Sequence, residues 1–129
     1  MNDIFSSSGL SSQLQKMEEI TQQIAERAHK DRNPVIEVCE SLAKYIQEFE
    51  ASLSSDQEVG ARLVTFGQAV TFHISQVGFS KPNIVTFYGT TDNGEQVQLI
   101  QHVSQLSVLL IAMKRVSEEP KRPIGFVWN

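Results

Sequence analysis

The sequence has little cysteine, proline, glycine or aromatic content, and it has no long hydrophobic run. With 1 Cys, 4 Pro and 7 Gly in 129 residues, it is neither a disulfide scaffold nor a collagen-like or low-complexity chain. The longest apolar stretch, residues 106–113, is interrupted by Ser107 and is far shorter than the roughly 20 residues of a membrane-spanning helix. What remains is 40% hydrophobic and 20% charged, as in an ordinary globular protein of about one domain.

Several site types and targeting signals are also missing. Cys39 is the single cysteine and cannot form an internal disulfide, so we expect an inert core thiol in a reducing compartment. Residues 1–10 lack the basic and apolar segments of a secretory signal, and we expect a cytoplasmic protein with no membrane contact. One Cys and three widely separated His give no zinc-ligand spacing, and the glycine motifs of nucleotide-binding loops are absent. We therefore expect no metal and no cofactor.

The net charge of −4 is unevenly distributed along the chain. Residues 1–58 hold 5 Lys+Arg and 11 Asp+Glu, a net charge of −6, whereas residues 59–129 hold 6 and 4, a net charge of +2. An acidic chain is unsuited to duplex DNA, which is bound through a basic surface. The basic cluster has two interpretations: a small anion site, or solvated strand ends that keep an edge soluble. Its members are Lys114, Arg115, Lys121 and Arg122.

Two helices are predicted in the first half of the chain. Residues 1–9 are Ser-rich and are expected to form a flexible tail. Residues 10–30 carry apolar side chains every three or four positions, the pattern of an amphipathic helix. Asn33-Pro34 ends that helix and begins a second one, which reaches about residue 53. The second helix has an apolar face broad enough to pack on a sheet: Val35, Val38, Leu42, Tyr45, Ile46, Phe49 and Leu53.

From about residue 59 the hydrophobic period changes to 2, which is typical of strands. Asn93-Gly94 is the strongest turn signal, because both residues tolerate the backbone conformation of a tight hairpin. The segment 106–115 is almost continuously apolar, which fits a strand covered on both faces, or a helix; we predict a strand. Strands are predicted at residues 62–66, 70–77, 83–90, 96–102, 106–115 and 124–128.

The predicted fold class is α+β. Two N-terminal helices precede a five- or six-stranded antiparallel meander, which either lies open beneath the helices or curls into a small barrel. Residues 10–129 are expected to form a single domain, with a helical part at 10–54 and a β part at 59–129.

The second predicted strand alternates cleanly between apolar and polar residues. Phe72 and its apolar neighbours Val70 and Ile74 are expected to face the core. His73 lies on the opposite face with Thr71 and Ser75, and we interpret it as an ordinary polar residue on a wet face, without a placed catalytic partner.

An amide-rich segment, residues 96–105, is the most unusual feature of the chain. Amides offer hydrogen-bond donors and acceptors without charge, so a row of them can bind a polar heterocycle or a peptide backbone. The same residues would equally suit a hydrated strand and a tight bend. If they form a site, two arginines can reach it from neighbouring strand ends. The predicted ligand-binding residues are Gln98, Gln101, His102, Gln105, Arg115 and Arg122.

Four segments of the chain resemble those of a known family. They read Arg62-Leu-Val-Thr-Phe-Gly-Gln68, Val85-Thr-Phe-Tyr-Gly89, Gln96-Val-Gln-Leu-Ile-Gln-His-Val-Ser-Gln-Leu106 and Arg122-Pro-Ile-Gly-Phe126. On these residues the chain is similar to a family of small bacterial proteins of unknown function, over about residues 33–126. The resemblance implies no activity, and the first predicted helix lies outside it.

Two classes of function remain open. The first is a non-enzymatic binding or assembly protein that forms a homodimer through residues 10–53, displays a polar pocket on its sheet, and takes a small anionic ligand or a protein partner. The alternative is a small-molecule handler that sequesters or processes a nucleotide-like anion. No convergent pair of titratable groups can be assembled from the sequence, so binding is favoured over catalysis.

Overall fold

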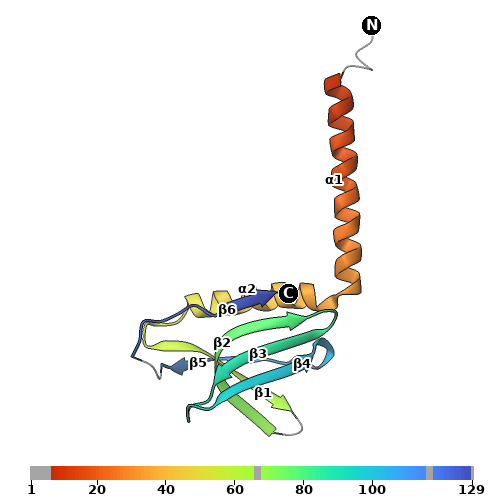
Figure 1. Ribbon diagram of the computed structural model, residues 1–129. Helices are drawn as coiled ribbons and strands as arrows, with labels where there is room; N and C mark the ends of the chain where they lie inside the picture. The colour runs from red at the N-terminus through yellow and green to blue at the C-terminus, as the bar shows by residue number, and fades with distance from the viewer. Residues whose placement is uncertain (1–6, 66–67, 116–117, 129) are drawn as a thin grey trace. The chain divides into compact units, whose positions relative to one another are not determined.

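The computed structural model describes residues 7–65, 68–115 and 118–128 (Figure 1). The chain divides into two units, one ending at Arg32 and one beginning at Asn33, and each is described by itself. Within the described ranges, no helix is both long enough and apolar enough to cross a membrane.

Helix α1, Ser7–Arg32, forms the first unit. It begins inside the segment expected to be a tail, of which residues 1–6 lie outside the described residues. Its last turn carries basic side chains, which interact favourably with the negative end of the helix dipole. The predicted apolar stripe is present but uncovered, because each of its large side chains is at least half exposed: Leu10, Leu14, Met17, Ile20 and Ile24.

Helix α2, Pro34–Ala51, opens the second unit with the predicted proline in its first turn. As predicted, it packs on the sheet, where it contacts β1, β2 and β3 (Figure 1). The predicted face is confirmed at Val35 and Ile46, which are fully buried, but not at Tyr45, which is 67% exposed; Cys39 is also fully buried. Burial raises the pKa of the Cys39 thiol to about 11, in agreement with an inert core cysteine.

The sheet has six strands, in the order β4-β3-β2-β1-β5, with β6 also paired to β2. This open order does not close into a barrel. All pairs are antiparallel except β2–β6, which is parallel. The strands are β1 (Gln57–Thr65), β2 (Gln68–Ser80), β3 (Ile84–Thr90), β4 (Gln96–His102), β5 (Leu109–Lys114) and β6 (Gly125–Trp128).

The meander holds for β1 to β4 but not for β5. After β4 a short 3-10 helix, η2 (Val103–Gln105), turns the chain, and β5 then pairs with β1. Strand β5 therefore lies at an edge and is only partly covered, with Leu109 56% exposed, so the prediction of a strand covered on both faces is wrong. The predicted turn between β3 and β4 is present, with Gly94 at a φ of 83°.

One face of the sheet forms the core, with Phe72 and Phe87 fully buried on the side that packs against α2. The sequence predicts that the opposite face of β2 is exposed to solvent, but this face is not uniformly exposed. His73 is only 8% exposed, whereas the supposedly inward Val70 is 39% exposed. Side chains from β1 and from the β3–β4 turn cover His73. Val70 is more exposed because it lies near the start of β2.

We expect Phe72→Ala to lower the free energy of unfolding by about 3–5 kcal/mol, because it removes a fully buried ring and leaves a cavity. Val70→Ala, on the same face of the same strand, is expected to cost about 1 kcal/mol or less because Val70 is already partly exposed. Urea unfolding of both variants measures the difference. Equal costs would contradict the placement of the core.

Candidate functional site

A cleft of about 770 Å³ lies beside the middle of β2. Strand β1 pairs with β2 as far as Gly60 opposite His73, and β6 pairs with β2 from Gln76 onward. The residues of β2 between these two partners, among them Ile74 and Ser75, line the cleft. Its other walls come from the β3–β4 turn and from residues 119–123. The cleft therefore forms where one neighbour of β2 ends and the next begins.

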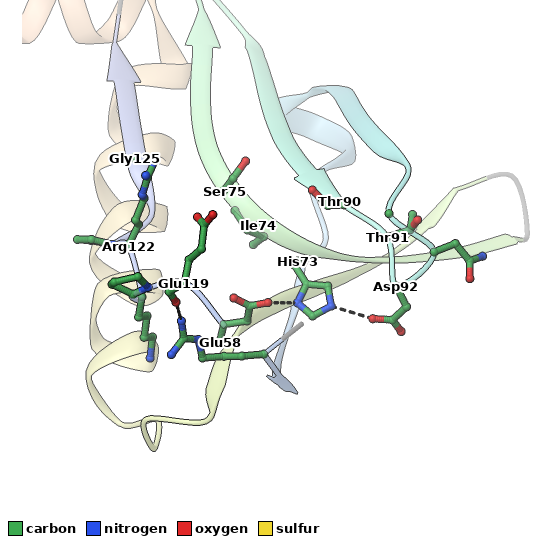
Figure 2. A pocket seen from close by; sticks show the side chains of 16 residues that line it. Glu58, His73, Ile74, Ser75, Thr90, Thr91, Asp92, Glu119, Arg122 and Gly125 are labelled. Atoms are coloured by element: carbon green, nitrogen blue, oxygen red, sulfur yellow. Dashed lines mark hydrogen bonds and ion pairs between the residues drawn. The ribbon is translucent and has the colours of Figure 1, made fainter. Parts of the chain in front are cut away.

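His73 forms the centre of a charged cluster at the base of this cleft (Figure 2). Its Nε2 lies 2.8 Å from Asp92 Oδ1, and its Nδ1 lies 2.5 Å from Glu58 Oε1. The Nε2 contact is a hydrogen bond, whereas the Nδ1 contact is close but does not have the geometry of a hydrogen bond. The His73 side chain is 10% exposed, against 31% for Glu58 and 74% for Asp92.

Strand register and one turn position these three residues. Gly60 is paired with His73, so Glu58, two residues earlier on β1, faces the same side of the sheet. Asp92 belongs to the turn that Gly94 closes with a backbone hydrogen bond to Thr91. On β3, a Cβ at position 89 would lie 2.1 Å from the carbonyl oxygen of His73, so Gly89 allows β3 to approach β2 at this point.

The interpretation of His73 as a wet residue without a partner is wrong. Its partners come from 15 residues before it and 19 residues after it, and neither Glu58 nor Asp92 stands out in the sequence. A neutral imidazole donates from one nitrogen only, and the imidazolium donates from both. Because a carboxylate contacts each ring nitrogen, these two contacts restrain the orientation of the His73 ring and the position of the turn that carries Asp92.

The basic residues that line the cleft lie just after β5 and in the segment that leads to β6. The Arg115 guanidinium donates to the carbonyl oxygens of Ser55, at 3.3 Å, and of Glu119, so no carboxylate neutralises it through these bonds. The Arg115 backbone N–H also donates to the backbone carbonyl oxygen of Asp56, at 2.9 Å, which fixes Arg115 beside the start of β1. The Ser54 hydroxyl donates to the Asp56 carboxylate and lowers the pKa of that group.

Lys121 and Arg122 complete the cationic lining of the cleft. Within residues 7–65, 68–115 and 118–128, neither side chain has a hydrogen-bond or ion-pair partner. Two positive charges at the cleft are therefore available to a ligand.

The structure separates the residues that the sequence grouped into one site. Arg115 and Arg122 line the cleft described above. Gln98 lines a second, smaller cavity of about 440 Å³ with Ser75 and Tyr88. The amides do not converge because Gln98 and Gln101 are three positions apart on one strand and face opposite sides of the sheet.

The remaining predicted residues lie at the far end of β4, in neither of these two cavities. Gln101 is 8% exposed, and its Oε1 has no hydrogen-bond partner within the described residues. His102 precedes η2, and its Nδ1 accepts a hydrogen bond from the Ser104 backbone at 3.1 Å. Gln105 ends η2 and is exposed.

The part of the chain that the structure describes contains no group of three or more His, Cys, Asp or Glu residues arranged to hold a metal ion.

Comparison with known proteins identifies the family of the chain. The model of a family described as a family of unknown function, DUF6173, matches residues 28–127, in agreement with the resemblance seen in the sequence. No curated protein and no solved structure matches the chain. The matched range includes every cleft residue and only the last turn of α1.

We expect His73→Ala to cost about 1–3 kcal/mol of unfolding free energy, because it leaves Glu58 without its partner in a partly buried position. Asp92→Ala should cost less, about 1 kcal/mol at most, since Asp92 is mainly exposed. Urea unfolding of both variants and of the double variant measures the coupling between them. Glu95→Ala, in the same turn, is the control, and a His73→Ala cost no larger than this control would contradict a cluster centred on His73.

Proposed function

We propose that this chain, which belongs to the DUF6173 family of unknown function, is a non-enzymatic binding protein. In this proposal it forms a homodimer through its helices and holds a small anionic ligand in the cleft on its sheet. The compartment proposed for it is the cytoplasm, where the thiol of Cys39 stays reduced. Duplex DNA is not the proposed ligand, because the chain as a whole is acidic.

One observation carries the proposal of an anionic ligand: Lys121 and Arg122 face the cleft without partners among the described residues. Arg115 adds a third positive charge, and its guanidinium donates hydrogen bonds to the carbonyl oxygens of Ser55 and Glu119. A volume of about 770 Å³ lies within the usual range for small-molecule sites. An anion that enters the cleft could therefore contact Lys121 and Arg122 without breaking a hydrogen bond between described residues.

Binding without turnover is favoured by the contacts of His73. Both of its ring nitrogens lie against carboxylates, Glu58 on one side and Asp92 on the other. A general base needs a ring nitrogen within hydrogen-bonding reach of the substrate proton. In this arrangement neither nitrogen points at a free ligand position.

Assembly is supported by the uncovered stripe of α1. Five large apolar side chains on this helix are each 50–65% exposed. An isolated helix is marginally stable in water, and its stability normally comes from burial of such a stripe. The apolar face of α2 is already used on the sheet. We therefore propose that α1 of a second copy of the chain covers this apolar stripe.

We expect inorganic phosphate to shift the amide NMR signals of residues that line the cleft, with an affinity that falls as NaCl is added. Arg122→Gln should weaken this binding about five- to tenfold by removing a charged hydrogen-bond donor. Lys44→Gln removes an exposed charge from α2, away from the cleft, and should leave binding unchanged. The proposal fails if phosphate up to about 10 mM causes no shifts at the cleft.

Light scattering at tens of micromolar is expected to give the mass of a dimer, since ordinary protein interfaces have micromolar or tighter affinity. Ile24→Glu places a charge in the exposed stripe of α1 and should shift the protein toward monomer. Gln22→Glu adds the same charge in the same turn but outside the stripe, and the dimer should persist. A monomeric wild-type protein, or equal effects of the two variants, would exclude α1 as the interface.

A further inference from the structure

The charges of the cleft are divided between two sides (Figure 2). Arg122 and its neighbour Lys121 lie in the segment between β5 and β6, whereas Asp92 lies in the β3–β4 turn. In Figure 2, Arg122 and Asp92 stand on opposite sides of the drawn group, with Glu58 and His73 between them. A ligand that fills the cleft therefore meets Lys121 and Arg122, together with Glu119 from the same segment, on one side and the carboxylates of Asp92 and Glu58 on the other.

The two carboxylates retain hydrogen-bonding capacity. Glu58 contacts His73 through Oε1, and Asp92 contacts the same ring through Oδ1. Within the described residues, the second oxygen of each carboxylate has no hydrogen-bond partner. An ionised carboxylate offers about four acceptor positions, so each group can still accept from a ligand hydroxyl.

A purely anionic ligand does not match this distribution. It would be attracted by Arg122 and Lys121 but repelled by Asp92 and Glu58, and a neutral polyol would leave the cations unpaired. A ligand with a phosphate at one end and hydroxyl donors at the other satisfies both sides. Two neighbouring hydroxyls suit a carboxylate well, as in the binding of ribose by an acidic side chain in dinucleotide sites.

We propose that the cleft selects phosphate esters that carry a vicinal diol, the chemistry shared by sugar phosphates and ribonucleotides. The phosphate lies against Lys121 and Arg122, and the diol donates to the free oxygens of Asp92 and Glu58. This inference rests on the proposed anion-binding function and adds the requirement for hydroxyl donors at the acidic side.

The test compares matched pairs of compounds by isothermal titration or NMR with the full-length protein. AMP and ribose 5-phosphate carry the diol, whereas 2′-deoxy-AMP and 2-deoxyribose 5-phosphate lack it. We expect each diol compound to bind at least about tenfold more tightly than its deoxy partner, the size of one hydrogen bond to a charged group. Tighter binding of AMP than of ribose 5-phosphate identifies a nucleotide, and equal or weaker binding identifies a sugar phosphate.

Variants separate the two sides of the cleft. Asp92→Asn and Glu58→Gln keep the size of each side chain but remove its charge, and we expect either change to reduce the preference for the diol while phosphate itself still binds. Arg122→Gln should weaken all four esters by the same factor. Glu95→Gln, in the turn that carries Asp92 but outside the lining of the cleft, is the matched control and should keep the preference.

The inference is overturned if the deoxy compounds bind as tightly as their partners, or if both carboxylate variants retain the full preference. Either result leaves the proposed function intact as long as inorganic phosphate binds the cleft. If neither phosphate nor any ester binds, the proposed function and this inference fail together.

Discussion

The architecture of the second unit depends on the backbone pairing of β2. This strand of 13 residues is bordered by β3 on one side, and on the other by β1 along its first half and β6 along its second. The backbone N–H and C=O groups of a buried strand need hydrogen-bond partners. Strand β6 therefore pairs with β2 where β1 no longer does. The change of partner occurs near a register shift between Ile74 and Gln76, and the space between the two neighbours becomes the cleft.

The same change of partner explains why a histidine is buried on the face opposite the core. His73 is the last β2 residue paired with β1, and it is also paired with Thr90 at the end of β3. Glu58 therefore approaches its ring from β1, and Asp92 approaches it from the turn that follows β3. Two of the three acidic side chains that line the cleft, Glu58 and Asp92, contact His73, while Lys121 and Arg122 have no partner within the described residues.

Helix α1 differs from the second unit in family coverage and in the exposure of its apolar side chains. The family match begins at residue 28, so nearly all of α1 precedes it, whereas α2 and the whole sheet fall within it. The apolar face of α2 is buried against the sheet, and that of α1 is exposed. Both helices carry an apolar stripe, and the stripe of α2 is packed against the sheet of its own unit.

The sequence alone determined the local elements of this protein: the break at Pro34, the turn at Gly94 and the inward face of Phe72. These follow from backbone sterics and from the 3.6- and 2-residue periods, which act within a few residues. Tertiary structure alone decided that β5 pairs with β1 and that His73 is buried between Glu58 and Asp92. Pairing partners and the cover over a sheet face depend on register between distant segments, which no local pattern encodes. For that reason Arg115 and Arg122 were recognised as charged candidates, but the cluster that they accompany was not.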